Sequence, residues 1–191
     1  MVNKRGWQVY PDRRGKLYLP FYLCHMNEEI EIRKIRPEDN KALAVILRNA
    51  LTEFGADKPG TAYFDPTTDN LFELFQQPRS VYFVALINNE IVGGVGIYTT
   101  EGLPSDTCEL VKMYLSSKAR GRGLGKFLID KCIAQAIEEG YSKMYLETLP
   151  ELHKAVKVYE KFGFKYLDAP LGNSGHFGCD VWMIKELKIE S

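Results

Sequence analysis

The sequence predicts one α/β domain in which strands and helices alternate along the chain. Seven short runs are rich in apolar or β-branched residues and have turn-like borders, which is typical of strands. Three or four amphipathic segments with helical spacing lie between these runs. No internal repeat, low-complexity segment or linker divides the 191 residues, of which 45% are hydrophobic, so we expect one sizeable core.

The predicted strands include one hairpin that the residues at its turn specify. Asn88 and Asn89 separate the second and third strands, and asparagine tolerates the positive φ angles of a tight turn. The second and third strands should therefore pair with each other. In chain order, the seven predicted strands are Ile30–Arg36, Val81–Ile87, Ile91–Thr99, Glu109–Leu115, Lys143–Leu149, Phe164–Leu167 and Val181–Leu187.

The predicted helices are bounded by prolines and glycines. Pro37 and Pro150 stand where a first helical turn accepts proline, and two acids follow Pro37. Gly140 and Gly163 stand just past the ends of two segments, where glycine commonly terminates a helix. The predicted helices therefore cover residues 37–51, Asp69–Gln77 ahead of a proline, 123–139 and 150–162.

Charge and cysteine placement exclude several classes of function. Lys and Arg total 25, as do Asp and Glu, so no net charge attracts nucleic acid or an anionic membrane. No apolar run is long enough to cross a bilayer and no signal peptide is recognisable, so we expect a cytoplasmic protein. Widely spaced cysteines without a C-x-x-C pair favour free thiols, and isolated histidines predict no metal site. The cysteines are Cys24, Cys108, Cys132 and Cys179.

The first 29 residues differ in character from the rest of the chain. They are basic, aromatic and aperiodic, and the regular pattern begins only at Ile30. We therefore expect an N-terminal extension over residues 1–29 and a domain over 30–190. Met26 resembles an internal start, so Met1–His25 is interpreted either as an appended arm or as an over-extended translation start.

A glycine- and arginine-rich turn, KARGRGLGKFLID at residues 118–130, lies between a predicted strand and a predicted helix. A helix start offers unpaired amides and a positive dipole end, and glycines let an anion approach them closely. A Walker loop is excluded because three residues, not four, separate Gly121 from Gly125-Lys126. The dinucleotide fingerprint would need its third glycine at Lys126, so it is excluded too. From these residues alone, an exposed turn with incidental arginines is an equal alternative.

Two motifs in this sequence resemble those of the GNAT superfamily, the acetyl-CoA-dependent N-acetyltransferases. Arg120-x-x-Gly123-x-Gly125, just after the strand ending KMYLSS, is similar to the family's Gln/Arg-x-x-Gly-x-Gly/Ala signature. AVKVYEKFGF, Ala155–Phe164, is similar to its later helix ending in Tyr-Glu-Lys-x-Gly-Phe. With the order of strands and helices, the resemblance covers roughly residues 30–188.

The resemblance implies a fold and an activity. The fold is the three-layer α/β arrangement of the family, called α+β in some schemes: a mixed, mostly antiparallel seven-stranded sheet with helices on both faces and a splayed pair of central strands. The activity is acetyl transfer from acetyl-CoA, without a metal, to a primary amine of a small molecule, amino acid or peptide by direct attack in a ternary complex. The alternative is a non-catalytic acyl-CoA-binding module on the same fold. A homodimer is left open.

The resemblance also assigns the coenzyme-binding positions. In the family, amides of the signature and helix start hold the pyrophosphate, and the preceding strand pairs with the pantetheine arm as an added strand would. The amide of Met113 is the candidate donor to the thioester oxygen. The matching strand positions are Lys112, Met113, Tyr114 and Leu115, and the matching turn positions are Arg120, Gly121, Arg122, Gly123, Leu124, Gly125 and Lys126.

Two catalytic residues follow from the same match. Glu109 stands eleven residues before Arg120, as does the general base in one branch of the family, and partial burial would raise its pKa toward neutrality. Tyr159 matches the tyrosine that serves as general acid in many members. The alternatives are a lysine-paired strand-edge carboxylate for Glu109, a core position for Tyr159, and His176 or ordered water as the base.

This chain departs from the family pattern at Leu152, where many members have an asparagine that contacts the coenzyme. That contact is expected to be absent or to come from His153 or Thr148. Acceptor specificity is expected from the segments 53–70 and 169–178, both long enough to shape a pocket. Their acidic residues, which could attract a cationic amine, include Asp57, Asp65 and Asp69.

Overall fold

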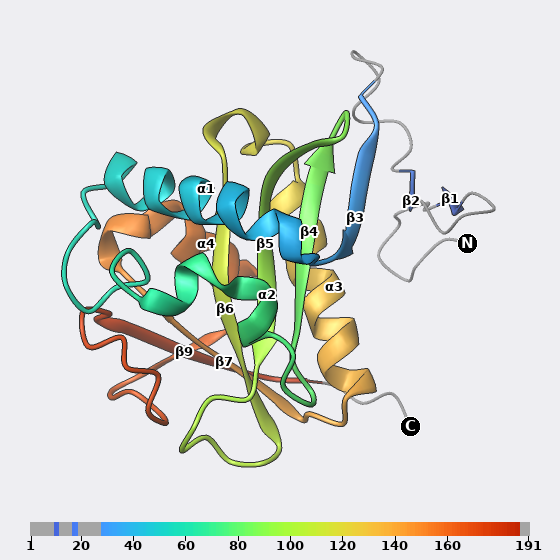
Figure 1. Ribbon diagram of the computed structural model, residues 1–191. Coiled ribbons are helices and arrows are strands. Elements are labelled where there is room, and N and C mark those ends of the chain that lie inside the picture. Colours follow the sequence, from blue (N-terminus) through green and yellow to red (C-terminus); the bar gives the residue numbers. More distant parts are fainter. Residues whose placement is uncertain (1–9, 12–16, 19–27, 188–191) are drawn as a thin grey trace.

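The computed structural model describes residues 10–11, 17–18 and 28–187, and a seven-stranded sheet forms their centre (Figure 1). All neighbouring strands are antiparallel except β6 and β7, which are parallel. The seven predicted strands and the mixed, mostly antiparallel sheet are thus confirmed. In spatial order the strands are β3 (Ile30–Lys34), β4 (Val81–Ile87), β5 (Glu90–Tyr98), β6 (Thr107–Leu115), β7 (Lys143–Thr148), β9 (Val181–Glu186) and β8 (Lys165–Leu167).

The predicted hairpin joins β4 to β5. Asn88 and Asn89 have φ angles of 50° and 65°, the left-handed conformation that asparagine tolerates better than most residues. The side chain of Asn88 also accepts a hydrogen bond from the amide of Glu29 at 2.8 Å, which ties this turn to the start of β3.

The two helices predicted to start at Pro37 and Pro150 do so, each with a short 3₁₀ turn. The segment predicted as a helix over Asp69–Gln77 forms only four α-helical residues, so that prediction is too long. Asn70, at φ −131° and ψ 46°, separates this helix from a 3₁₀ turn that begins where Asp65 accepts a hydrogen bond from the amide of Thr67. The helices are η1 (Pro37–Asp39), α1 (Asn40–Glu53), η2 (Pro66–Asp69), α2 (Leu71–Leu74), η3 (Ser117–Ala119), α3 (Leu124–Glu138), η4 (Pro150–Leu152) and α4 (His153–Lys161).

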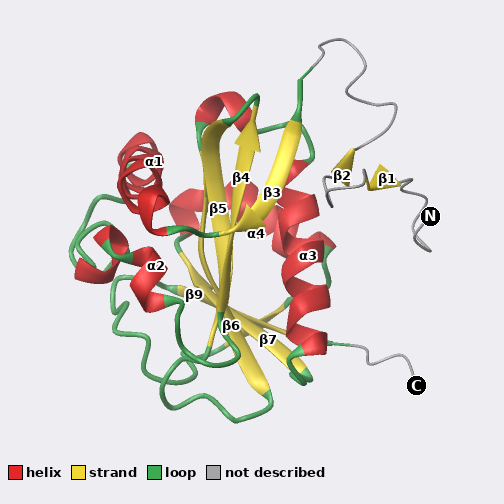
Figure 2. Ribbon diagram, turned by 45° about the vertical axis from the view of Figure 1, so that its right-hand side comes forward, coloured by secondary structure: helices red, strands yellow, loops and turns green. Residues whose placement is uncertain are grey.

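Helices cover both faces of the sheet, as predicted (Figure 2). Side chains of a strand point alternately to its two faces, and β4 divides its apolar residues accordingly. Alternate residues from Val81 to Ala85 pack with α3 and α4, whereas Tyr82, Val84 and Leu86 pack with α1 and α2. The two resulting cores hold the helices, and with them the loops at the strand ends, in fixed positions.

The central strands β6 and β7 diverge. Their pairing begins at Thr107 opposite Lys143 and ends at Glu109 opposite Tyr145, although β6 continues to Leu115 and β7 to Thr148. The predicted splayed pair is therefore confirmed. Beyond Glu109, the edge of β6 that faced β7 has no strand partner among the described residues.

A bulge bends β6 in the stretch that is paired with β5 but not with β7. Gly94 pairs with Tyr114 and Gly96 with Val111, so the single residue between the glycines on β5 faces two residues, Lys112 and Met113, on β6. Lys112 takes a φ of 50°. An extra residue in one strand increases the local twist and redirects the side chains that follow. Here it turns the long side chain of Lys112 toward the segment before α2.

The N-terminal part is described only in pieces. β1 (Tyr10–Pro11) and β2 (Leu17–Tyr18) form a separate antiparallel pair. The rest of the predicted extension up to residue 27, including both alternatives for Met1–His25, and Cys24 lie outside the described residues. In the part that is described, no helix is long and apolar enough to cross a membrane, and the other three cysteines are free thiols.

We predict that Gly93→Ala will be strongly destabilising. Gly93 has a φ of +146°, and an added Cβ would lie 2.1 Å from the carbonyl oxygen of Tyr114 on β6. We expect a loss of at least about 2 kcal/mol in the free energy of unfolding, measured by urea denaturation. The control is Gly140→Ala, at φ +81° with no atom within 4 Å of the added Cβ, which should lose about 1 kcal/mol. Equal losses for both variants would contradict the prediction.

Candidate functional site

A cavity of about 470 Å³ lies where β6 and β7 diverge. Its walls come from β6, from the glycine-rich turn before α3, from the end of β7, from α4 and from the C-terminal part of α1. Two loops, one after α1 and one before β9, close its other end. The cavity thus brings together segments that are far apart in the sequence.

The glycine-rich turn forms one end of this cavity. Gly121 and Gly123 have φ angles of +77° and +79°, and no atom lies within 4 Å of where a Cβ would stand on either. Gly123 caps the 15-residue helix α3, and no side chain caps its first-turn amides. Unpaired amides, a positive dipole end and space above glycine backbone are the elements of an anion site.

Gly125 has a different role in the turn. A Cβ there would lie 3.2 Å from the methyl carbon of Met113, so a glycine allows the start of α3 to approach β6 closely. Lys126 lines the cavity beside it. The side chain of Leu124 is buried in the core between α3 and the sheet, which is compatible with the prediction that Leu124 contributes its backbone amide to the turn.

Both arginines of the turn are paired with glutamates. Arg120 lines the cavity, donates to the carbonyl of Leu115 at 3.0 Å and makes a bidentate ion pair with Glu53 at the end of α1. Arg122 pairs with Glu28 and does not line the cavity. The two guanidinium groups therefore fix the turn against neighbouring segments.

The stretch of β6 that has no described strand partner on its β7 side forms the long wall of the cavity. Its residues Lys112, Met113, Tyr114 and Leu115 all line the space. The carbonyl of Lys112 accepts a hydrogen bond of 2.9 Å from the Tyr82 hydroxyl, so it is occupied from the β4 side.

Tyr159 faces the same wall from α4. Its hydroxyl lies 3.7 Å from the sulfur of Met113, and its ring packs edge-on against Phe164. The side chain is buried, and burial raises the pKa of its hydroxyl above the ordinary value. Tyr159 is therefore both a core residue and a cavity residue, and it is protonated at neutral pH.

Glu109 lies at the point where β6 leaves β7. The residue is 3% exposed, and its carboxylate accepts a hydrogen bond from the Thr100 hydroxyl. Burial raises the pKa of Glu109 to about 7, and the negative charge of Glu147 adds to this, against the hydrogen bond from Thr100. A carboxylate whose pKa lies near neutrality can take up and release a proton under working conditions.

Glu147 on β7 is a cavity residue that the sequence motifs did not indicate. Its carboxylate oxygens accept one hydrogen bond from the Tyr145 hydroxyl at 2.8 Å and one from the Ser174 hydroxyl at 2.7 Å. The sequence offered one indication of this residue, a glutamate near the end of a mostly apolar strand, KMYLET. The two hydroxyl groups that bind Glu147 become apparent only in three dimensions.

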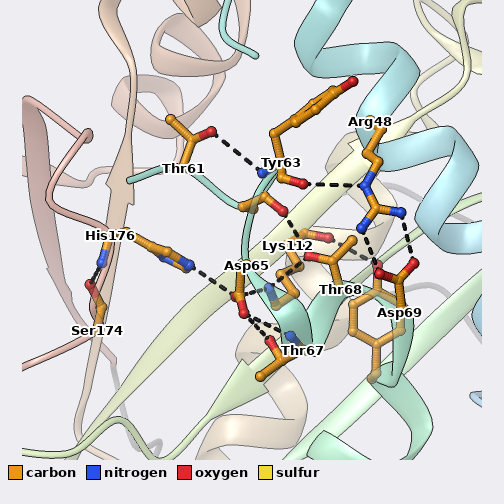
Figure 3. Close-up of polar contacts among 12 residues, drawn as sticks. Arg48, Thr61, Tyr63, Asp65, Thr67, Thr68, Asp69, Lys112, Ser174 and His176 are labelled. Atoms are coloured by element: carbon orange, nitrogen blue, oxygen red, sulfur yellow. Dashed lines mark hydrogen bonds and ion pairs between the residues drawn. The ribbon is translucent and has the colours of Figure 1, made fainter. Parts of the chain in front are cut away.

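Asp65 joins three segments of the chain at this end of the cavity (Figure 3). The Lys112 ammonium lies 2.5 Å and the His176 Nε2 3.1 Å from the same Asp65 oxygen. Burial opposes ionisation of Asp65, but the bond from His176 and the charge of Lys112 outweigh it and hold its pKa well below the usual range. Burial lowers the pKa of Lys112.

The two segments expected to bind the acceptor do meet over the cavity. Two of their acidic residues, however, already form ion pairs with basic residues of this chain. Asp69 makes a bidentate bond with Arg48 at 2.7 Å, and Asp65 is held as described above. Gly178 donates its amide to the carbonyl of Gly60 at 2.9 Å, which ties one segment to the other.

At the family's asparagine position, Leu152 lines the cavity, as does Thr148. His153 does not line it, and its ring nitrogen lies 3.1 Å from the carbonyl of Glu151. Among residues 28–187 and the two short N-terminal strands, no group of His, Cys, Asp and Glu side chains could hold a metal ion.

Comparison with known proteins finds a matching family, sequence relatives and structures of the same fold. Residues 46–164 match the model of the acetyltransferase (GNAT) family. The uncharacterized N-acetyltransferase YjgM of Escherichia coli is 41% identical over 158 residues, 82% of this chain and 94% of that protein. A GNAT-family acetyltransferase structure from Staphylococcus aureus Mu50 has a TM-score of 0.74 at 22% identity, covering 83% of this chain and 99% of its own. PaiA N-acetyltransferase from Thermoplasma acidophilum, solved with coenzyme A, has a TM-score of 0.66 at 20% identity, covering 82% and 98%.

We predict that Glu109 makes stability depend on pH. Its pKa is raised from the ordinary 4.5 to about 7 in the folded state, so the folded protein binds the proton more tightly. The unmodified protein should therefore lose up to about 3 kcal/mol relative to Glu109→Gln as the pH rises from about 4.5 to 7. Urea denaturation at several pH values measures this difference. Glu160→Gln, an exposed site on α4, is the control, and a pH-independent difference for Glu109→Gln would refute the raised pKa.

Proposed function

The chain belongs to the GNAT family of acetyltransferases, and from this premise we propose that it transfers the acetyl group of acetyl-CoA to a primary amine of a small molecule, amino acid or peptide. One observation carries the proposal. A single cavity joins an uncapped helix start, an unpaired strand edge and a buried glutamate with a pKa near 7. The first two suit an extended phosphate-bearing donor, and the third suits proton removal from an amine.

The donor lies along β6 in this proposal. The turn from Arg120 to Lys126 receives the pyrophosphate, because Gly121 and Gly123 leave room above their backbone. The backbone of Met113 to Leu115 pairs with the pantetheine arm, because this stretch has no neighbour on its β7 side. The fold neighbour PaiA, solved with coenzyme A, supports such a donor.

Glu109 acts as the general base, directly or through water. The acceptor arrives as an ammonium ion and must lose a proton before its nitrogen can attack the thioester carbonyl. A pKa near 7 gives Glu109 both a large ionised fraction and useful basicity at neutral pH. As the C–N bond forms and the C–S bond breaks, the backbone amide of Met113 donates to the carbonyl oxygen, where negative charge develops.

Tyr159 acts as the general acid. Its raised pKa keeps the proton on the hydroxyl, and its position against Met113 places that hydroxyl beside the wall where the thioester lies. Tyr159 donates its proton to the departing sulfur, and the second proton of the amine nitrogen restores the hydroxyl. The balance is one amide, one free thiol and one proton taken by Glu109 and released to solvent.

Coenzyme binding is tested with a charge placed in the glycine-rich turn. In Gly123→Glu, a carboxylate fills the proposed phosphate space and repels the phosphate, so calorimetry should show at least a 100-fold loss of acetyl-CoA affinity. Gly140→Glu is the matched control, because Gly140 has nearly the same φ and an equally open Cβ position at the other end of α3. Undiminished binding by Gly123→Glu would defeat the assignment of the turn.

The chemical roles are tested by turnover. We expect a screen for released coenzyme A across primary amines, amino acids and peptides to find an acceptor, and binding without turnover would favour a non-catalytic role. With that acceptor, Glu109→Gln should lower kcat by roughly 10²–10⁴-fold and Tyr159→Phe by roughly 10²-fold, with little change in acetyl-CoA affinity. An unchanged rate in Tyr159→Phe would leave Tyr159 as a core residue alone.

A further inference from the structure

Glu147 lines the cavity near the end that the loops after α1 and before β9 close, called here the acceptor end. The mechanism above does not use the negative charge of Glu147. We propose that Glu147 binds the acceptor as an alkylammonium ion, so that the substrates are amines cationic at neutral pH and not neutral arylamines. This inference rests on the proposed function and identifies the residue that recognises the acceptor's positive charge.

The carboxylate of Glu147 is oriented by neighbours that do not neutralise it. Tyr145 from its own strand and Ser174 from the loop before β9 each donate a hydroxyl to one oxygen. A carboxylate offers about four acceptor sites, so two hydroxyls leave room for another donor. Among the described residues, Glu147 has no cation within ion-pair distance.

The lysine at this end of the cavity is already paired. Lys112 lies against Asp65, and His176 bonds to the same oxygen. The charges of Lys112 and Asp65 cancel, so Glu147 and ionised Glu109 leave this end of the cavity negative. A partly buried carboxylate without a cation is costly, and an entering ammonium group would relieve that cost.

The position of Glu147 also suits transfer of the amine to Glu109. Glu109 pairs with Tyr145, and Glu147 lies two residues beyond Tyr145 on the same face of β7, so both glutamates line the cavity and the charge of Glu147 raises the pKa of Glu109. An ammonium between them would hydrogen-bond to Glu147 and lie within reach of Glu109, which takes its proton. Thr100, His176 and Lys112 also act on Glu109, and the last two are both bonded to Asp65. Among the described residues, Glu147 has no such ionic contact.

The test compares Glu147→Gln with the unmodified enzyme and with Glu160→Gln. Glu160 is a matched control because it also accepts a tyrosine hydroxyl, from Tyr166, but lies outside the cavity. For Glu147→Gln, we expect the KM for alkylamine acceptors to rise at least tenfold, with no change in the KM for acetyl-CoA. The acid limb of kcat/KM should move to lower pH, because a like charge beside Glu109 is gone. Unchanged acceptor KM and pH profile would overturn the proposal.

A binding measurement separates this inference from the proposed function. Calorimetry of the protein saturated with coenzyme A should show that benzylamine binds, that aniline does not, and that Glu147→Gln weakens benzylamine binding at least tenfold. Such a result supports the ammonium site even if no turnover is found. Equal binding of benzylamine and aniline, or equal binding by both proteins, would overturn it while leaving the transferase activity standing. Ser174→Ala, which keeps the charge and removes one hydroxyl, should weaken benzylamine binding by a smaller factor.

Discussion

The separation of β6 from β7 after Glu109 is the constraint on which the rest of the site depends. Two parallel strands that stayed paired would leave no space between them, and every backbone group on that edge of β6 would be used. The bulge opposite Val95 supports the separation, because an extra residue increases the local twist of β6. The cavity and the edge of β6 that lacks a strand partner in the described part of the chain both follow from this change in pairing.

The glycine-rich turn and the acidic end of the cavity have different physical origins. At the turn, the proposed anion site is made by backbone amides. Gly121 and Gly123 contribute because they have no side chain to fill the space above that backbone. At the other end, function is a property of charges held in fixed orientations. Thr100 positions Glu109 there, and hydroxyl groups from two separate segments position Glu147. In the proposed function, one end therefore selects its ligand by space and dipole, and the other by charge.

The sequence was sufficient for what depends on local pattern. The strands and the Asn88-Asn89 hairpin follow from neighbouring residues alone, and the motifs resembling the family placed Glu109 and Tyr159, both of which line the cavity. It was insufficient where partners are distant. In the first turn of α2, the amide of Phe72 donates to the side chain of Asn40, 32 residues earlier, and the partners of Asp65 lie 47 and 111 residues away. Glu147 was missed because Ser174, 27 residues later, gives it its orientation.

An unpaired strand edge is normally dangerous to a protein, because a strand from another chain can add to it and start aggregation. Natural sheets protect such edges with charges, bulges or covering helices. Here the edge without a strand partner is in the middle of the sheet. It is covered by the residues of α1 and α4 that line the cavity. The cavity leaves space beside the backbone of β6, while residues from both helices cover that edge. The fold thus keeps an open hydrogen-bonding edge inside the molecule and covers it with helices instead of closing it with a strand.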